Sequence, residues 1–555
     1  MGIFEESFGE EYGMIGCSRD GVTASSGIMS LKKNLDGIKQ FGMILNSIDN
    51  LVPKNHIVRK YEVAIDWNFI YDITSDLYST KGAPAIDPVV LFKMVMLNYL
   101  EGINSMRKLC EKAETDIAYR WFLGIDFSEK IPDHSTYSQN YARKFAGSNV
   151  AEKIFNEILS QLYDYGMIDA SVIYGDATHV KANANKKKHK DIVVKELSKT
   201  YQEDLIKDIN NDRLEHGMKE LIVEEDIDEV EEVETDELLK TNDSEEVIEV
   251  IKDENGKVTS YKTYDAETGE YHIRKKKEYK RIKQSTSDPD SGFYHKGEHE
   301  KIFAYSVSAF CDKHGYILGA FIDAGNKHDS VTFFNLYEKV KNTPFFDEIK
   351  TVCMDAGYLT PAIVRKLILE GKTPLLPYVR PKTKEDFFKK YEYTYDEFYD
   401  CYICPNNETL EYATTNKNGY KEYKSDSSKC ANCPFLGKCT TSKNHQKTIA
   451  RHVWEDYLEQ AHDIRHTLGM NEIYAERKET IERCFADGKE KHGLRFTRYT
   501  GQERVSDSIF LTLACMNLKK MARRIPKEYM DIPNIMLLLE FLDYFSSLFK
   551  LKNQN

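Results

Sequence analysis

Apolar and polar residues follow two different rhythms along the chain, and the change falls near residue 170. Before it, apolar positions recur at helical spacing between capping residues. In PAIDPVVLFKMVMLNYLEG (84–102), Asp87 and Pro88 are suited to start a helix and Gly102 to end it. The pattern predicts a helical region over 56–150, either a module of the helix-turn-helix kind or a plain helical bundle.

After residue 170 the pattern predicts strands alternating with helices. The expected strands are 171–182, a hairpin over 301–326, 349–358 and 372–379, and the expected helices are 328–342, 361–371, 471–493, 507–524 and 533–549. The helix over 471–493 would have roughly six turns. Such an order describes a mixed sheet with helices packed on it.

Two long segments interrupt this order, 183–298 and 380–450. The first holds an acidic run, 224–254, with 16 acids and two lysines; in the rest of the chain 75 Lys and Arg balance 74 Asp and Glu. The net charge of −13 is therefore one local, solvated run and does not exclude a nucleic-acid partner. The basic runs 186–190 and 274–281 fit either phosphate contacts or a solvated tether.

We accordingly expect six parts. They are an N-terminal segment (1–55), a helical DNA-binding domain (56–150), a catalytic core in three pieces (170–182, 299–379 and 465–525), a charged insertion (183–298), a Cys-rich insertion (380–450) and a C-terminal helix (526–555). No apolar run approaches the ~20 residues needed to span a bilayer, and the N-terminus lacks the features of a signal peptide. We expect a cytoplasmic, nucleoid-associated protein without a membrane partner.

Two aspartates end predicted apolar strands, where side chains enter the functional crevice of such sheets. They are Asp176 and Asp355. A single strand-end aspartate is usually a cap, but two on one sheet with a helix acid form a cage of hard oxygens suited to Mg²⁺. Glu482 on the late helix is the candidate third acid, with Lys478 and Lys489 on its face. A solvated Lys-Glu-Lys ladder is the competing interpretation.

Several stretches, taken in order, carry a family resemblance: GDATHVKANANK, STSDPDSGF, AYSVSAFCDKHGYILG, CMDAGY, CPNNETL with CANCPFLGKC, and RKETIERCFADGKEKHGLRFTRYTG. They resemble bacterial insertion-sequence transposases of the DDE type, in particular the eleven-eighty-two branch with a Cys-containing insertion before the last catalytic acid. The segment 61–102 resembles the N-terminal domain of that group. The resemblance covers about 56–525 and implies an α/β fold: an RNase H-like mixed sheet with flanking helices, preceded by an α-helical domain and interrupted by two insertions.

The resemblance also assigns residues. It implies that Asp176, Asp355 and Glu482 are the catalytic acids and bind two Mg²⁺ (or Mn²⁺) ions. Residues implied or suited by charge to support DNA binding are Tyr474, Arg477, Lys489, His492, Arg495 and Arg498.

One spacing departs from the family pattern. Four residues separate Arg477 from Glu482, where the related signature has three, so Lys478 stands where strict spacing would put the arginine. The roles of Tyr474 and Arg477 are therefore less secure than that of Glu482, and Glu479 is the alternative third acid.

Five of the eleven cysteines fall within 39 residues. Cys404, Cys430, Cys433 and Cys439 are the set that the resemblance favours, with Cys401 left over. Four thiolates favour a structural Zn²⁺; an Fe–S cluster and an unmetallated cluster are the alternatives.

Together these features predict a DDE transposase that binds the terminal inverted repeats of its insertion sequence, cleaves DNA and transfers the freed 3′-OH to a target. Its partner would be double-stranded DNA, both transposon ends and target, and joining two ends implies a homodimer or higher oligomer. The competing interpretations are a catalytically silent or domesticated DNA-binding regulator and a host RNase H-like nuclease that cuts but never joins.

Overall fold

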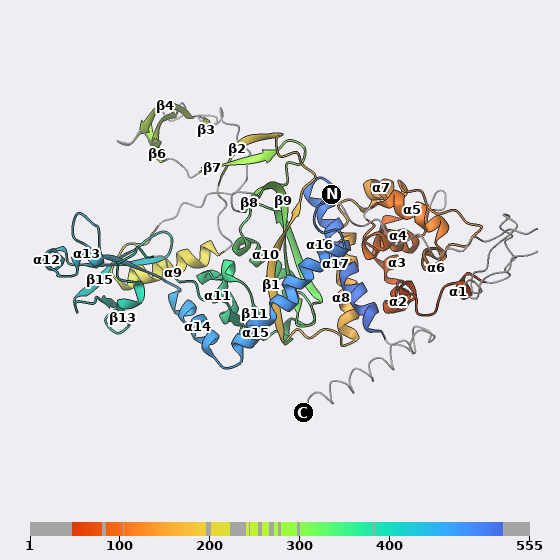
Figure 1. Cartoon of the computed structure of the whole chain (residues 1–555). Coiled ribbons are helices and arrows are strands. Elements are labelled where there is room, and N and C mark those ends of the chain that lie inside the picture. Colours follow the sequence, from red (N-terminus) through yellow and green to blue (C-terminus); the bar gives the residue numbers. More distant parts are fainter. Residues whose placement is uncertain are drawn as a thin grey trace, which may run out of the picture. The chain divides into compact units, whose positions relative to one another are not determined.

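A computed structural model gives the fold of the chain (Figure 1). It describes residues 47–79, 85–103, 105–195, 201–221, 240–242, 245–252, 258–265, 271–275, 279–296, 300–380 and 383–525. The chain divides into two compact units, 1–51 and 52–555. The described part of the first unit holds α1 (Ile48–Leu51). The remaining described helices and strands belong to the second unit. The expected C-terminal helix lies outside the described residues, as does most of the acidic run.

The region before residue 170 is helical, as predicted. Its α-helices are α2 (Ile57–Ala64), α3 (Phe69–Thr74), α4 (Pro88–Leu100), α5 (Met106–Thr115), α6 (Ile117–Leu123), α7 (Thr136–Asn140) and α8 (Val150–Asp164). The expected cap starts α4: Asp87 accepts a hydrogen bond from the Val89 amide at 2.7 Å, and Pro88 occupies the first turn. Residues on every side of α4 are buried, so this helix forms the centre of the helical region.

Five strands form the core of the main sheet, in the order β12-β11-β1-β9-β10. They are β1 (Val172–Lys181), β9 (Glu300–Asp312), β10 (Ile317–Ala324), β11 (Thr351–Cys353) and β12 (Thr373–Leu375). Strand β9 runs antiparallel to both of its neighbours, β1 and β10. Strand β11 lies parallel to β1, and β12 lies parallel to β11. This order and these directions are those of an RNase H-like mixed sheet, which confirms the fold class.

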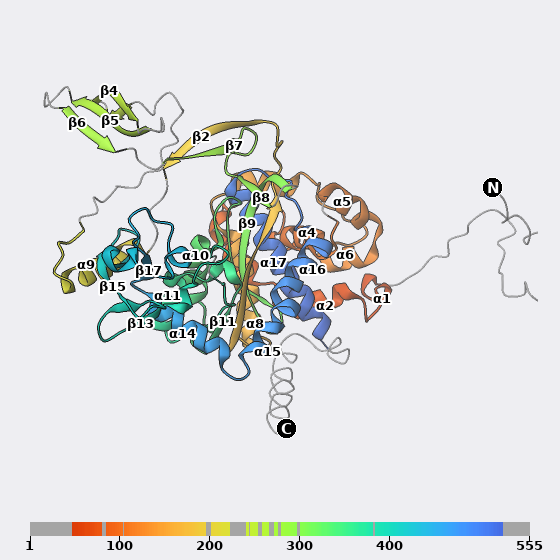
Figure 2. The same ribbon diagram turned by 60° about the vertical axis from the view of Figure 1, so that its left-hand side comes forward.

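Additional strands extend this sheet into the first insertion. They are β2 (His189–Lys195), β7 (Tyr279–Ser285) and β8 (Gly292–Lys296), with β8 pairing the first residues of β9. A separate four-stranded sheet holds β3 (Lys240–Asn242), β4 (Glu245–Lys252), β5 (Val258–Asp265) and β6 (Tyr271–Lys275). Figure 2 shows β2 and β7, which pair antiparallel, running side by side.

Helices cover the main sheet and join it to the helical region. They are α10 (Asp329–Lys341), which packs on β9 and β10, α11 (Pro361–Leu369), which packs on β12, and α17 (Gln502–Arg524). The long helix α17 contacts β10 as well as α2, α4 and α8. One hydrophobic core therefore runs from the helical region into the sheet. No helix within the described ranges is long and apolar enough to cross a membrane.

The Cys-rich insertion folds as an antiparallel sheet of its own, in the order β13-β14-β15-β16-β17. Its elements are β13 (Thr394–Asp396), β14 (Cys401–Ile403), β15 (Thr409–Thr415), β16 (Tyr420–Ser425), α12 (Ser427–Ala431), α13 (Leu436–Cys439) and β17 (Thr448–His452), followed by α14 (Glu455–His466). A small core of Tyr393, Tyr402, Leu410, Tyr423 and Ile449 lies within it. Such a core lets the insertion hold its shape beside the main sheet.

A helix of the first insertion, α9 (Gln202–Glu215), joins the second insertion to the helices that cover the main sheet. Leu205 and Ile209 bury their side chains with Ala362 of α11 and Trp454, which precedes α14. At its other end, Asp212 accepts a hydrogen bond from the Thr415 hydroxyl and pairs with Lys421 Nζ at 2.5 Å. One face of α9 is thus apolar toward the core and acidic toward β15 and β16.

His492, one of the expected DNA-binding residues, falls inside the molecule where the end of α16 (Arg483–Lys491) meets the end of α4. Its Nδ1 lies 3.1 Å from the Tyr99 carbonyl oxygen, so this nitrogen carries the hydrogen. Gly102 completes the seam: a Cβ there would lie 2.7 Å from the Lys491 carbonyl oxygen. We therefore no longer propose His492 as a DNA contact.

Replacing Asp212 with alanine is expected to loosen the Cys-rich sheet. The change leaves the half-buried Lys421 without its ion-pair partner and removes one of the two hydrogen-bond partners of the buried Thr415 hydroxyl, a loss of about 3 kcal/mol for a buried pair. Amide hydrogen exchange in β15 and β16 should accelerate roughly 100-fold. The exposed Lys207→Ala on the same helix is the control; equal exchange in both variants would contradict the role of Asp212.

The burial of His492 makes stability depend on pH. Burial, with Lys519 nearby, lowers the pKa of His492 from 6.5 to about 4. Because the unfolded chain takes up this proton below pH 6.5 and the folded one does not, stability is lost as pH falls from 6.5 toward 4. The loss is about 2 kcal/mol at pH 5. Urea midpoints at pH 7.5 and pH 5 should differ less in His492→Gln than in the parent; an equal difference would argue against this assignment.

Candidate active site

The parallel pairing of β1 and β11 brings the two predicted aspartates to one place. The last paired residues are Tyr174 and Cys353, and Asp176 and Asp355 each follow two residues later. Both carboxylates therefore lie just beyond the paired residues of two neighbouring strands. One detail differs from the prediction: β1 does not end at Asp176 but continues to Lys181, because β9 is longer than β11 and keeps pairing with it.

Asp355 is fixed by the tight turn that follows it. Its Oδ1 accepts a hydrogen bond from the Gly357 amide at 2.9 Å, so it caps the short 3₁₀ turn Ala356–Tyr358. A Cβ at Gly357 would lie 3.2 Å from the same oxygen. The glycine in the CMDAGY stretch thus allows the backbone to approach the carboxylate closely.

The late helix is not one regular helix. It consists of α15 (Met470–Glu476), a π-helical turn (Lys478–Glu482) and α16. In the π turn the Glu482 amide points to the Arg477 carbonyl five residues earlier, at 3.5 Å. A π turn takes up one residue more than an α turn. It therefore absorbs the extra residue that the spacing analysis found, and Arg477 and Glu482 lie on one side.

Arg477 holds two of the three acids together. Its Nη2 lies 2.9 Å from Asp176 Oδ2, and its Nη1 lies 2.7 Å from Glu482 Oε1. The guanidinium is nine-tenths buried, and its Nε has no hydrogen-bond partner among the described residues. The negative charges of Asp176, Asp355 and Glu482 raise the pKa of Arg477 against its desolvation. The three acids thus share one buried cation.

The charge of Arg477 does not fully offset the effect of burial on the pKa of Asp176. Burial raises the pKa of Asp176 to about 6, in spite of Arg477 and the Ala177 amide, which lower it. The charges of Asp355 and Glu482 raise it further. A carboxylate with such a pKa lies in a site that is short of positive charge.

The geometry distinguishes the two glutamates that the sequence left open. Glu482 faces Arg477 and is about half exposed, at 45%. Glu479 is 77% exposed and pairs instead with Arg483 at 3.3 Å, on the outer side of the helix. We therefore take Glu482 as the third corner of the site.

The other candidate bases have different surroundings. Tyr474 lies at the site, since the charges of Arg477, Asp355 and Glu482 all act on it; burial is the main cause that raises its pKa. Lys489 lies half-buried on α16. Arg495 and Arg498 are exposed, and Arg495 pairs with Glu490.

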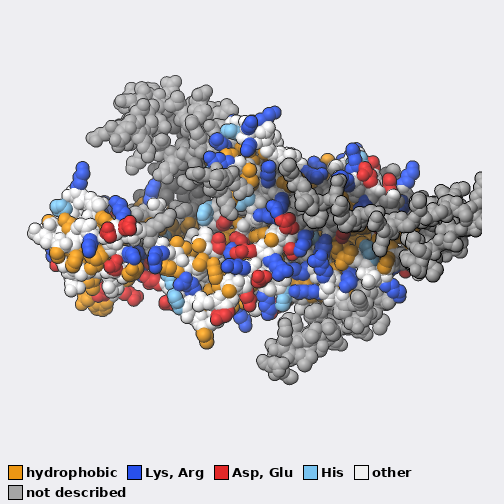
Figure 3. All heavy atoms as spheres, viewed as in Figure 1, with side chains coloured by type: hydrophobic (Ala, Val, Ile, Leu, Met, Phe, Trp, Pro, Cys, Tyr) orange, Lys and Arg blue, Asp and Glu red, His pale blue; other side chains and the backbone are white. Residues whose placement is uncertain are grey.

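The segment carrying these two arginines runs beside the end of β1. The Lys181 amide donates to the Arg495 carbonyl at 3.1 Å, and the Thr497 amide donates to the Lys181 carbonyl at 2.9 Å. The bases are thus attached to the strand that carries Asp176. On the face drawn in Figure 3, basic side chains are mixed with acidic ones rather than forming one continuous patch.

Two polar residues near the acids were missed by the sequence analysis, Asp329 at the start of α10 and Tyr358 after Asp355. The charge of Asp355 acts on both. The only signal for them was position: Asp329 opens a helix in NKHDS, and Tyr358 ends CMDAGY. Neither pattern indicates chemistry by itself.

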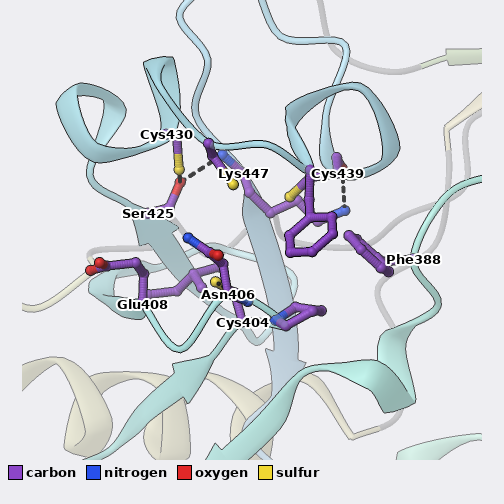
Figure 4. Close-up of a pocket in the computed structure, with 12 residues that line it drawn as sticks. Phe388, Cys404, Asn406, Glu408, Ser425, Cys430, Cys439 and Lys447 are labelled. Carbon is purple, nitrogen blue, oxygen red and sulfur yellow. Dashed lines mark hydrogen bonds between the residues drawn. The ribbon is translucent and has the colours of Figure 1, made fainter.

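The four cysteines of the predicted set line one pocket of the Cys-rich insertion, together with Phe388, Ser425, Phe435 and Lys447 (Figure 4). Cys401 is not among the residues that line it and lies buried in β14. The thiols have protein neighbours: Cys439 Sγ lies 3.1 Å from the Tyr393 hydroxyl, and Cys430 Sγ lies 3.2 Å from Ser425 Oγ. Burial is the main cause that raises the pKa of Cys439.

Neither set of residues is drawn together as tightly as a bound metal would require. In the described ranges, no three or more His, Cys, Asp or Glu side chains form a group that could hold a metal ion. At the acids Arg477 stands between Asp176 and Glu482, and at the cysteines hydroxyl groups engage the sulfur atoms. The residue types still fit: carboxylates suit Mg²⁺ and thiolates suit Zn²⁺.

Two segments of the chain match known protein families. Residues 46–143 match a family described as a transposase domain (DUF772), and residues 403–522 match a family described as a transposase DDE domain. The second match contains Glu482 and the four cysteines. No curated protein and no solved structure matches the chain. Two segments of the chain therefore match transposase families, with an RNase H-like sheet between and around them.

Proposed function

We propose that this chain is the transposase of its own insertion sequence: it binds the terminal inverted repeats, cleaves the DNA at each end and joins the freed 3′-OH to a target. The observation that carries the proposal is the convergence of Asp176 and Glu482 on Arg477, beside Asp355, at one edge of the sheet. A DDE transposase cleaves and transposes DNA, and the family generally uses Mg²⁺ or Mn²⁺.

The residue types of the acid site suit divalent cations, and two such ions would be held by Asp176, Asp355 and Glu482. The convergence of Asp176 and Glu482 on one side of the late helix supports this, because carboxylate oxygens are the donors that such ions prefer. Bound there, the ions would polarise the phosphodiester and lower the pKa of the attacking hydroxyl. The chain itself holds Asp176 and Asp355 on neighbouring strands, and the π turn sets the side of the late helix on which Glu482 lies.

The basic residues of the late helix and the following segment would hold DNA. Lys489, Arg495 and Arg498 are suited to phosphate contacts, which position a strand without reading its sequence. Arg477 and Tyr474 lie inside the site and would orient the acids and the scissile strand. We propose that the helices of 56–150 supply part of the readout of the terminal repeats.

The remaining parts of the proposal follow from the reaction. Because two ends must be brought together, the working complex would contain at least two copies of the chain. Its substrate, double-stranded DNA, places it at the nucleoid in the cytoplasm. We also keep the division of the chain into a helical domain, a three-piece core and two insertions as a proposal about function.

The four-cysteine pocket is proposed to hold one structural Zn²⁺. Thiols from the β14–β15 turn, α12 and α13 face the same pocket, and none of these residues lies near the acids in sequence. A closed site of four thiolates would fix the tip of the insertion and would not catalyse. The displaced partners would be hydroxyls such as those of Tyr393 and Ser425.

The acid site can be tested with Asp176→Asn, Asp355→Asn and Glu482→Gln, and with Glu479→Gln as the matched control on the outer side of the helix. We expect each of the first three to slow cleavage of end-containing DNA at least about 100-fold in Mg²⁺ while DNA binding in an electrophoretic shift assay persists. Glu479→Gln should cleave like the parent.

Undiminished cleavage by Asp176→Asn would refute the proposed site. Joining is measured separately, with pre-cut ends and a supercoiled target. Cleavage without joining would indicate a nuclease on the same fold, and binding with neither reaction would indicate a DNA-binding regulator.

The zinc proposal is tested on purified protein by elemental analysis. We expect about one zinc per chain in the parent and in Cys401→Ser, and a large loss in Cys430→Ser and Cys433→Ser. The serine variants should also expose 383–452 to limited proteolysis, because the ion closes this part of the insertion. Iron with visible absorbance would indicate an Fe–S cluster instead, and no metal in the parent would contradict the proposal.

A further inference from the structure

The segment 181–190, which leads from the last residue of β1 into β2, carries five lysines and no acid. All five are exposed, and within the described ranges none of them forms an ion pair; they are Lys181, Lys186, Lys187, Lys188 and Lys190. Other exposed bases, such as Lys429, Arg483 and Lys491, each pair with an acid. Five unpaired positive charges on ten residues create a local field that attracts an anionic partner.

The lysine run is an ordered turn and not a solvated tether. Asn185 fixes its start: its Oδ1 accepts a hydrogen bond from the Lys187 amide, and its carbonyl oxygen accepts one from the Lys188 amide, both at 3.0 Å. The Thr286 amide and hydroxyl donate to the Lys188 carbonyl oxygen at 3.2 and 3.3 Å. From His189 onward, β2 pairs with β7. Because these bonds use only the backbone of the lysines, their side chains stay available to a ligand.

A second basic segment lies against the first. Arg498 is exposed, and its carbonyl oxygen accepts a hydrogen bond from Asn183 Nδ2 at 2.8 Å. Lys181 forms a parallel bridge with Phe496. Since residues paired across neighbouring strands project to the same face, the Lys181 and Phe496 side chains lie on one side. Bases from two distant segments of the chain thus share one surface.

Phe496 indicates which kind of anion this surface fits. Its side chain is 51% exposed, although the amides of Lys181 and Thr497 fix the backbone around it by hydrogen bonds. In sequence it is flanked by Arg495 and Arg498. An exposed aromatic ring among bases is typical of nucleic-acid-binding surfaces, where rings stack on the bases. The ring therefore favours a nucleic acid over an acidic protein as the partner.

The position of Lys181 on β1 relates this surface to the acid site. Lys181 follows Asp176 by five residues, which is roughly 17 Å along a strand, or about five base pairs of DNA. An odd separation puts the two side chains on opposite faces of the strand. The surface would therefore contact DNA that flanks the cleaved bond and would add nothing to the acid site itself.

We propose that the lysines of 181–190 and Arg498, with the exposed ring of Phe496, form a basic surface that binds the sugar–phosphate backbone of the DNA duplex flanking the cleaved bond. The inference rests on the proposed function, since it names the surface with which the same chain holds its DNA. The duplex is either a transposon end or the target, because phosphate contacts position DNA without reading its sequence.

The direct test replaces Lys186, Lys187 and Lys188 together with glutamine and measures binding to a DNA duplex over a range of salt concentrations. Each lost phosphate contact removes roughly 0.9 from the slope of log affinity against log salt, so we expect the slope to fall by about two to three. Affinity in about 0.1 M salt should fall at least about 10-fold. The melting temperature should stay that of the parent, because the exposed amines make no ion pair within the described ranges.

The matched control removes the same charge from exposed positions elsewhere, in the triple variant Lys207→Gln, Lys219→Gln and Lys417→Gln. It should bind DNA like the parent. Equal binding by the two triple variants, whether both strong or both weak, would overturn the inference.

Two single substitutions test the order of the surface and the role of the ring. Asn185→Ala keeps every charge but removes the acceptor of the Lys187 amide, and we expect roughly threefold weaker binding. Phe496→Ser should weaken binding about 10-fold without changing the salt slope. Unchanged affinity in Asn185→Ala would indicate a solvated tether, and unchanged affinity in Phe496→Ser would overturn the contact of the ring.

Two duplexes distinguish the source of the bound DNA, one carrying the terminal repeat and one of unrelated sequence. Loss of affinity for both would place any duplex, the target included, on the basic surface; loss for the first alone would place the transposon end there. If the lysine variant binds like the parent while Asp176→Asn loses cleavage, the acid site stands and the basic surface is wrong. If the lysine variant loses binding but the parent neither cleaves nor joins DNA, the basic surface stands and the proposed reaction is wrong.

Discussion

The burial of like charges around a single guanidinium is the constraint on which the rest of the site depends. Arg477 can reach Asp176 and Glu482 together only if a strand of the sheet and a distant helix meet at the right register. The parallel pairing of β1 with β11 adds Asp355, and the π turn brings Glu482 to the side of Arg477. A shift of one residue in either element would leave a buried charge unpaired, which costs several kcal/mol.

Much of this arrangement was predictable from sequence. The apolar strands, the hairpin over 301–326 and the helices over 328–342, 361–371 and 507–524 have strong local signals, and the structure confirms them. The side of the late helix on which Glu482 lies was not predictable, because a 3.6-residue period assumes unbroken α-helical bonding. At Thr480 that bonding changes: its hydroxyl returns to the carbonyls of Glu476 and Arg477, at 2.9 and 3.2 Å. The shifted arginine spacing, which looked like a departure from the family, is the local sign of this turn.

The insertions show a different limit. Helix α9 has a polar sequence inside the charged insertion, yet it is held by residues far along the chain. Asp212 pairs with Lys421, and the Trp454 Nε1 donates to Asp208 at 2.7 Å. Partners separated by more than 200 residues leave no mark in local periodicity. Linking the two insertions this way ties the Cys-rich sheet to the helices that cover the catalytic strands.

The net charge of the acid site constrains what it can bind in the proposed reaction. Three carboxylates and Arg477 carry two net negative charges; two divalent ions and one scissile phosphate would leave the site with one positive charge in excess. A buried site is most stable when its charges cancel, because any remainder is poorly solvated there. Glu482 is about half exposed, so water can screen the remaining charge on this side of the site.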